Sequence, residues 1–145
     1  MKIDRLRVSS YLMEIESCRA EIEQLLQRGT LKPDSLELKA AKYLLLVTAE
    51  AISGLLQHLL ARCKGVAAGG YLDTLAKAQE HEIISERLAA RLKPFLEFRN
   101  SLIHRYWKVD DEKLIENIRT GCNDFTRFTE EIQSALARLD AAGGS

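Results

Sequence analysis

Residues 43–56 read YLLLVTAEAISGLL, and this stretch places the strongest constraint on the fold. Wound into a helix, it is apolar on almost every side, and only Glu50 brings a charge into it. A helix that is apolar all round must be covered on more than one face. The stretch therefore predicts a central helix of a bundle, or a helix that packs against both a core and a partner subunit.

The flanking residues indicate where this helix begins and ends. Pro33 is followed by Asp34 and, three residues further on, by Glu37, which is the arrangement of a capping box. In the other direction the apolar pattern continues to about Cys63 and stops before the segment GVAAGG. We therefore expect one long helix between Asp34 and Cys63.

The segment before this helix carries the same kind of signal. From Val8 to Leu26, apolar side chains recur every three or four residues, which is the spacing of a helix with one buried face. Gly29 follows directly after Arg28 and can adopt the left-handed backbone conformation that ends many helices. The pattern predicts a first helix from near the start of the chain to about Arg28.

Further helices are expected in the second half of the chain. Residues 71–80 have the pattern of a short helix, and Ser85 has the side chain of a helix N-cap in front of ERLAARL. Pro94 lies inside the helix that follows and should kink or restart it. A last helix begins near Asp110 or Asp111 and carries a long, regular apolar stripe.

Composition agrees with a single all-α domain. The chain has 145 residues, of which 46% are hydrophobic, so it can bury one core. Its abundant Leu, Ala, Glu, Lys and Arg lose little entropy in helices, and only two prolines interrupt the sequence. We expect a compact bundle of four to five helices over residues 1–140, followed by a disordered tail at residues 141–145, which read AAGGS.

The sequence predicts a cytoplasmic protein with reduced thiols. The N-terminus alternates charges, as MKIDRLR, without an apolar leader segment, and no window approaches the roughly 20 apolar residues that cross a bilayer. The three cysteines, Cys18, Cys63 and Cys122, are far apart and lie among apolar residues. We therefore expect packed, reduced thiols and no disulfide.

Charge is unevenly distributed along a chain whose net charge is zero. Such a balance argues against general electrostatic capture of nucleic acid. However, residues 87–108 contain six Lys or Arg against one acidic residue, Glu97. A charged helix face is often only solvated, so this basic segment becomes informative through the motif that it contains, RNSLIHRYW at residues 99–107.

The placement of Arg99 is the most informative feature of this segment. At about 100° per residue, Arg99 falls in the middle of the apolar face of its helix. That face is formed by Leu92, Phe95, Leu96, Leu102, Ile103 and Tyr106. A guanidinium is costly to bury alone, so it must meet an acid, a group of carbonyls or a groove open to an anionic ligand. Glu50 is either such a partner or a carboxylate at the edge of the core that pairs with another basic residue.

Arg99 and His104 together suggest chemistry on a phosphate. Cleaving RNA without a metal needs a base for the 2′-hydroxyl proton, an acid for the leaving 5′ oxygen and a cation for the charge on the phosphorane. In one regular helix the two side chains point about 140° apart, so they cannot meet one phosphate. They can do so if the helix ends near Ile103, or if a second subunit brings its own copy across a two-fold axis.

Other chemistries find little support in the sequence. His58, His81 and His104 lack the spacing with further ligands that a metal site of the HxxxH or CxxC kind requires. There is no GxxxxGKS phosphate loop, no GxGxxG motif after a strand and no GxSxG elbow. No metal and no cofactor are therefore predicted.

The motif Arg99-Asn100-x-x-x-His104-x-Tyr106 resembles the R-x4-H-x-Y signature of HEPN-domain proteins, in particular the HepT-like toxins paired with minimal nucleotidyltransferase antitoxins. The resemblance covers most of the chain: a long apolar second helix that contains TAEAI, a phenylalanine before Arg99, and a polar turn before a long final helix. The arginine and histidine alone form a weak motif, and the tyrosine and the helical context make it more specific. Trp107 is a bulky neighbour to which the resemblance assigns no role.

The resemblance implies an all-α homodimer that acts as a metal-independent endoribonuclease on single-stranded RNA. It places Arg99 and His104 in the cleft between subunits, with Asn100 as a supporting residue that orients His104. It also implies that a cognate minimal nucleotidyltransferase antitoxin attaches AMP to Tyr106 and so neutralises the toxin. Because the helix around residues 43–56 is apolar on more faces than one core uses, we expect it to form the dimer interface together with the helix that carries the motif.

Two other functions are compatible with the sequence. The chain can be a non-catalytic HEPN module that partners a nucleotidyltransferase or binds nucleotide. It can also be a purely structural helical protein. Incubation with RNA in EDTA distinguishes the ribonuclease from both, and a neighbouring gene for a small nucleotidyltransferase disfavours the structural protein.

Overall fold

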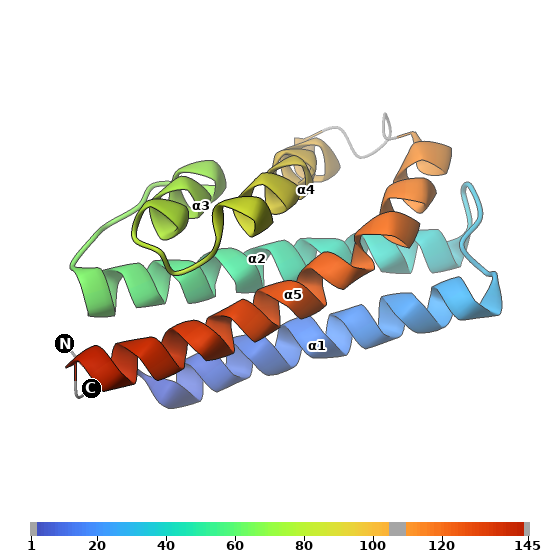
Figure 1. The fold of residues 1–145 in the computed structure, drawn as a ribbon. Helices are drawn as coiled ribbons and strands as arrows, with labels where there is room; N and C mark the ends of the chain where they lie inside the picture. Colours follow the sequence, from blue (N-terminus) through green and yellow to red (C-terminus); the bar gives the residue numbers. More distant parts are fainter. Residues whose placement is uncertain (1–2, 105–109, 144–145) are drawn as a thin grey trace.

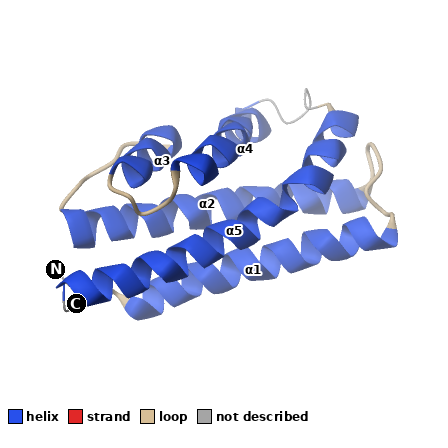
Figure 2. Cartoon of the chain, in the orientation of Figure 1, coloured by secondary structure: helices blue, strands red, loops and turns tan. Residues whose placement is uncertain are grey.

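The computed structural model describes residues 3–104 and 110–143, and of residues 101, 103, 104 and 141–143 it describes only the backbone. Within this part of the chain there are five α-helices and no strand (Figure 2). In chain order the helices are α1, Arg5–Arg28; α2, Leu36–Lys64; α3, Tyr71–Glu80; α4, Glu86–His104; and α5, Asp111–Gly143. The predicted all-α bundle is confirmed.

The helix α2 lies at the centre of the bundle, as its all-round apolar sequence predicted. It contacts each of the other four helices. The helices α1 and α5 run along one side of α2, whereas α3 and α4 lie on the other side (Figure 1). The start of α1 and the end of α5 lie at the same end of the bundle, where Arg5 pairs with Asp140.

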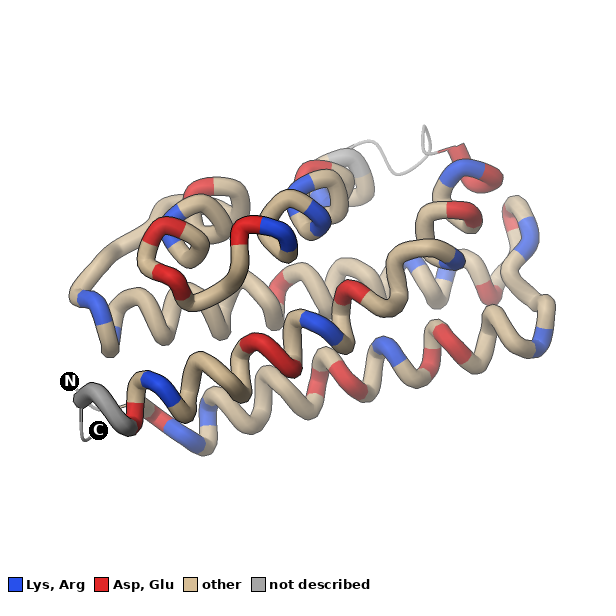
Figure 3. The backbone as a smooth tube through the Cα atoms, in the orientation of Figure 1, with Lys and Arg blue, Asp and Glu red and all other residues tan. Residues whose placement is uncertain are grey.

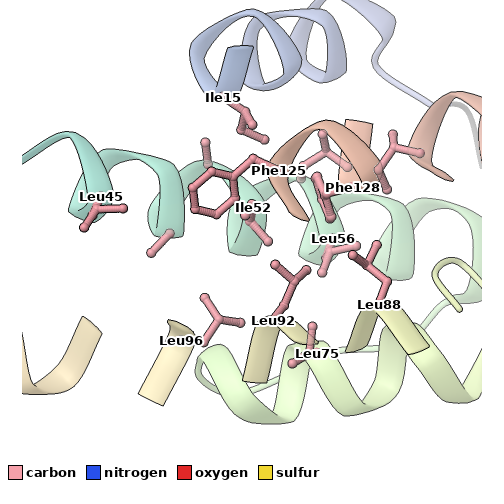
Figure 4. Packing of buried hydrophobic residues seen from close by; sticks show 14 of the residues in the cluster. Ile15, Leu45, Ile52, Leu56, Leu75, Leu88, Leu92, Leu96, Phe125 and Phe128 are labelled. Carbon is pink, nitrogen blue, oxygen red and sulfur yellow. The ribbon is translucent and has the colours of Figure 1, made fainter. Parts of the chain in front are cut away.

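The core is built around the middle of α2, where apolar side chains arrive from both sides (Figure 4). The residues of this cluster that the close-up labels are Ile15, Leu45, Ile52, Leu56, Leu75, Leu88, Leu92, Leu96, Phe125 and Phe128. Burial of each side chain of this size stabilises the fold by roughly 1.5–3 kcal/mol. Charged residues are spread along α1, α4 and α5, whereas the middle of α2 is nearly free of them (Figure 3).

By length and composition alone, α2 is also apolar enough to cross a membrane. The expectation that no window comes near this limit is therefore wrong, because few charged residues interrupt the apolar run of α2. Of its most apolar 18-residue window, 61% is buried inside the bundle. A central position in the core accounts for this composition, since core helices of soluble proteins pass the same test.

Most predicted helix ends are confirmed. Gly29 ends α1 with a left-handed backbone, at φ 67°. The bounds of α3 are those predicted, and Ser85 caps α4 by accepting a hydrogen bond from the N–H of Leu88 at 3.1 Å. Asp110 caps α5 in the same way through the N–H of Lys113, at 3.2 Å.

The predicted capping box of α2 is not formed, because the N-cap lies one residue after Asp34 and the residue three positions after this cap is Leu38, whose side chain cannot return a hydrogen bond. Ser35 is the N-cap, and its hydroxyl accepts a hydrogen bond from the N–H of Leu38 at 3.0 Å. Asp34 has a left-handed backbone, at φ 61°, which aspartate tolerates better than most residues. Its N–H donates to the carboxylate of Asp111 at 2.8 Å, so a contact distant in sequence decides the cap.

Pro94 does not restart the helix that contains it. One continuous helix, α4, extends from Glu86 to His104. Proline removes the hydrogen bond to the carbonyl four residues earlier, here that of Ala90. Both Pro94 and Ala90 are exposed, so water can satisfy this carbonyl and the helix continues.

The last helix is longer than the sequence suggested. It extends to Gly143, into the segment 141–145 that was predicted to be a disordered tail. Alanine has the highest intrinsic helix propensity, so Ala141 and Ala142 can prolong a helix that is already formed. Residues 144–145 lie outside the described residues.

Candidate functional site

Arg99 lies on the buried face of α4, as the helical spacing predicted. Leu96 stands three residues before it and Leu102 three residues after it, and both leucines are buried. Side chains three residues apart share a helix face, so the backbone directs Arg99 into the same row. Arg99 itself is half-buried. A cation is therefore built into an apolar face.

The partners of the Arg99 guanidinium are electrically neutral. Its Cζ lies 4.2 Å from the centroid of the Tyr71 ring, and its Nη1 donates to the Oδ1 of Asn100 at 3.3 Å. Its Nε is enclosed and meets no acceptor among the described residues. No acidic side chain in this part of the chain forms an ion pair with Arg99. The positive charge is thus held in place without being neutralised, as in a site for an anion.

Tyr71 is the residue of this site that sequence motifs did not reveal. It is the first residue of α3, and the packing of α3 against α4 brings it to Arg99. No helical spacing connects positions on two different helices. The only local signal is an aromatic residue at the start of a short helix, and this signal does not specify a partner.

The helix α3 is anchored to α2, and this anchor fixes the position of Tyr71. The buried hydroxyl of Thr74 donates to the carbonyl of Gly70 at 2.6 Å and accepts from the Nε2 of Gln57 on α2 at 3.3 Å. Leu75, the next residue, is buried in the core. A polar bridge and an apolar contact therefore hold the first turn of α3.

The other residues of the predicted motif are described to different extents. Asn100 is exposed, and its side-chain oxygen supports Arg99. His104 is the last residue of α4, and its side chain lies outside the described residues, so the predicted contact with Asn100 remains a prediction. Tyr106 and Trp107 lie outside the described residues.

The helical geometry separates Arg99 from His104. Because α4 continues through His104, the two residues stay about 140° apart around one axis. The helix α4 ends at His104, one residue after Ile103, and the side chain of His104 lies outside the described residues, so both arrangements that would let the side chains converge remain predictions.

Glu50 is exposed on α2. The predicted pairing of this carboxylate with a basic residue, either Arg99 or another, is not found among the described residues. Its neighbours on α2 explain the exposure: Ala49 and Ala51 face the core, and the helix turns Glu50 outward between them.

A groove of about 410 Å³ lies between α4 and α5. Its walls are mainly apolar and include Phe95 and Phe125, whose rings meet edge to face with centroids 5.0 Å apart. Phe98, the residue before Arg99, also lines it, and an ion pair between Arg91 and Asp124 stands at its edge. The groove can receive apolar groups, but it does not contain Arg99.

The cysteines are packed, as predicted. Cys18 is buried, and Cys63 and Cys122 are half-buried. Burial raises the pKa of all three thiols, so they remain protonated at neutral pH and are poor nucleophiles. Among the side chains that the structure describes, no group of three or more His, Cys, Asp or Glu could hold a metal ion.

The sequence and the fold both have known counterparts. The family profile described as Ribonuclease HepT-like matches residues 10–132. No curated protein matches the chain.

Several solved structures share the architecture. A tri-AMPylated HEPN toxin of Shewanella oneidensis in complex with MNT antitoxin has a TM-score of 0.81 at 19% identity, over 88% of this chain and 97% of that one. A mutant of the MntA–HpeT toxin–antitoxin complex has a TM-score of 0.79 at 19% identity, over 88% of this chain and 98% of that one. YutE from Bacillus subtilis, a cytosolic protein of unknown function, has a TM-score of 0.81 at 17% identity, over 99% and 95%. At such identities the likeness establishes the fold, which is that of HEPN toxins.

Proposed function

The chain belongs to the HepT-like ribonuclease family, and from this membership we propose that it is the toxin of a toxin–antitoxin pair and cleaves single-stranded RNA without a metal ion. The observation that carries the proposal is the placement of Arg99. It is a half-buried cation whose partners among the described residues are neutral, on the same helix as His104. Its charge is therefore available to a phosphate.

In the proposed reaction, the ribose 2′ oxygen attacks the adjacent phosphorus and the bond from phosphorus to the 5′ oxygen breaks. A base accepts the 2′-hydroxyl proton, and an acid protonates the leaving 5′ oxygen. The products are a 2′,3′-cyclic phosphate and a free 5′-hydroxyl. We assign the proton transfers to His104 and the stabilisation of the phosphorane charge to Arg99, with Asn100 holding the guanidinium.

A homodimer would supply both proton-transfer groups. Arg99 and His104 of one chain stand about 140° apart around the axis of α4, and a second copy can bring its own His104 to the same phosphate. The exposed face of α2 supports an interface there, since Tyr43 is 65% exposed beside the half-buried Leu46 and Val47. We therefore propose that α2 and α4 form the dimer interface, and light scattering at micromolar concentration should show a dimer.

We propose a minimal nucleotidyltransferase as the antitoxin partner, acting in the cytoplasm by adding AMP to Tyr106. An AMPylated toxin with its MNT antitoxin is among the proteins of similar fold. Tyr106 follows His104 by two residues in sequence. AMP at this position would put a phosphodiester anion beside the catalytic pair, where it would occupy the place of the substrate phosphate.

Incubation of the purified protein with single-stranded RNA in EDTA tests the ribonuclease activity. We expect cleavage of RNA and none of DNA of the same sequence, because the reaction needs the 2′-hydroxyl. His104→Ala should lower the rate by on the order of 10²-fold or more, the usual contribution of a general acid or base. Equal rates for His104→Ala and the wild type would show that another group transfers the protons.

Mass spectrometry tests the modification. After incubation with the nucleotidyltransferase, Mg²⁺ and ATP, AMP should be found on Tyr106 and be absent from Tyr106→Phe, which should keep most of its cleavage and resist neutralisation. AMP on other residues, or a modified protein that still cleaves RNA, would contradict this assignment. A wild-type protein that accepts AMP but does not cleave RNA even before modification would instead be the non-catalytic module.

A further inference from the structure

The contact between Tyr71 and Arg99 joins two helices at the candidate site, and no sequence motif includes it. We propose that Tyr71 is a positioning residue for Arg99: its ring holds the guanidinium and leaves N–H donors of the two Nη atoms free for a phosphate. This role rests on the proposed function, in which Arg99 contacts the reacting phosphate. The Tyr71 ring itself would touch neither substrate nor leaving group.

The geometry of a guanidinium explains how a ring can hold it without blocking it. The five N–H donors of arginine lie in one plane and point outward from its edge. Tyr71 lies against the guanidinium, with its ring centroid 4.2 Å from Cζ, and an aromatic face attracts a cation without using any N–H donor. Of the donors, one on Nη1 bonds to Asn100 and the one on Nε is enclosed. The donors of Nη2 and the second donor of Nη1 meet no acceptor among the described residues.

The neutrality of both partners distinguishes this arrangement from a structural ion pair. A carboxylate would fix the guanidinium equally well, but it would cancel the charge that an anion must find. An aromatic ring and an amide oxygen restrain the side chain and leave its full charge.

The ring of Tyr71, and not its hydroxyl, carries the proposed role. Among the described residues, the hydroxyl forms no hydrogen bond, whereas the ring lies against Arg99. The first turn of α3 holds the ring in place through Thr74, which bonds to Gly70 and to Gln57 of α2. Phenylalanine at this position should therefore replace tyrosine, and leucine should not.

Kinetics on an RNA oligonucleotide in EDTA test the role through substitutions at Tyr71, Leu72 and Arg99. Tyr71→Leu should lower kcat/KM by about tenfold, within the range of cation–π energies, and mainly through kcat. Tyr71→Phe should cleave like the wild type, as should Leu72→Ala, a control for changes in α3. In an Arg99→Ala background, Tyr71→Leu should have no further effect, because a positioning residue acts only through the group that it holds.

A second measurement does not depend on catalysis. In protein labelled with ¹⁵N-arginine, the Nε–Hε signal of Arg99, identified by its loss in Arg99→Lys, should be shifted by the aromatic ring. Contacts from the Tyr71 ring protons to the Arg99 side chain should be seen in the wild type. This observation does not require that a variant folds. The shift should persist in Tyr71→Phe and disappear in Tyr71→Leu, and inorganic phosphate should perturb the signal.

The outcomes separate this role from the proposed function. If Arg99→Ala is impaired but Tyr71→Leu cleaves as fast as the wild type, the positioning role is wrong and the ribonuclease assignment stands. If the wild type does not cleave RNA, the ribonuclease assignment fails and the Arg99 signal decides the positioning role. An Arg99 signal without ring contacts in the wild type would overturn it in either case.

Discussion

The junction of α2 with α5 and the junction of α3 with α4 each take up a basic side chain, and they treat its charge in opposite ways. Lys42 of α2 has a side chain that is only 7% exposed, and its Nζ lies 3.0 Å from the Oδ1 of Asp111 on α5. Arg99 is half-buried against Tyr71 and, among the described residues, hydrogen-bonds only to Asn100. A cation neutralised by a carboxylate fixes a junction, whereas a cation with neutral partners can still bind an anion.

Asp111 completes the first junction. Burial alone would raise the pKa of its carboxyl, but the N–H of Asp34 and the ammonium of Lys42 together outweigh burial and hold the pKa below its usual range. The carboxylate therefore stays ionised at neutral pH. It connects the start of α5 both to the turn before α2 and to α2 itself.

His58 is a third buried basic residue, and its side chain is neutral. Burial of the imidazole lowers its pKa, and the positive charges of Arg62 and Arg7 lower it further. The neutral ring accepts a hydrogen bond at Nε2 from the N–H of Asp4, at 3.0 Å. Only Arg99 therefore combines partial burial, a permanent charge and neutral partners among these three residues.

The largest effect is expected at Arg99, where a substitution should lower activity but not stability. Arg99→Ala should lower the rate of RNA cleavage by on the order of 10²-fold, the scale of losing one group that stabilises transition-state charge. Its stability to urea should change little, because the substitution also removes an enclosed donor without a partner. Cleavage kinetics and urea denaturation of the same preparation measure both. A large loss of stability would place Arg99 with Lys42 as a structural cation.

For Lys42 we expect a substitution to lower stability and to leave activity unchanged. Lys42→Met keeps the length of the side chain but removes the ammonium that pairs with Asp111. The carboxylate of Asp111, whose side chain is 21% exposed, then loses this cation. We expect a loss of about 2 kcal/mol of unfolding free energy, measured in urea, the scale of a hydrogen bond between charged groups. Cleavage at a temperature well below the unfolding midpoint should be unchanged. A variant as stable as the wild type would show that the ion pair contributes nothing net to the junction.

The neutral state of His58 should make the stability of the protein depend on pH. Because the pKa of folded His58 lies below the unfolded value of about 6.5, the unfolded state binds more protons just below this pH, and stability should fall as pH falls from about 6.5 toward the folded pKa. His58→Gln offers an amide oxygen to the N–H of Asp4 and does not titrate, so its stability should vary less over this window. Urea midpoints between about pH 7 and pH 5 test this, and equal slopes for both proteins would contradict it.

The smallest effect is expected at Arg91, a matched control for Arg99 on the same helix. Its Nε lies 2.7 Å from the Oδ1 of Asp124, and its side chain is 51% exposed. Exposed ion pairs contribute about 0.2–1 kcal/mol, so Arg91→Ala should cost no more than this in stability. Cleavage should stay close to that of the wild type. If Arg91→Ala lost as much cleavage rate as Arg99→Ala, the positive charge of α4 as a whole would matter more for cleavage than the position of Arg99.

The helices and the row in which Arg99 stands could be predicted from the sequence. Helical periodicity, the caps at Gly29 and Ser85, and the all-round apolar run of α2 depend on hydrogen bonds and side chains a few residues apart, so they can be read locally. The same spacing placed Arg99 between Leu96 and Leu102. Local reading failed where distant contacts decide, as at Asp34, whose N–H is taken by a residue of α5.

The partner of each buried basic side chain, in contrast, depends on how the helices pack. Lys42 and Asp111 are 69 positions apart, Asp4 and His58 are 54 apart, and Tyr71 and Arg99 stand on different helices. Such partners depend on how helices pack, and a helical pattern fixes which side is apolar but not which helix will cover it or in what register. Hence the sequence could predict that Arg99 needs a partner, whereas the packing of α3 against α4 made that partner an aromatic ring and left its charge available.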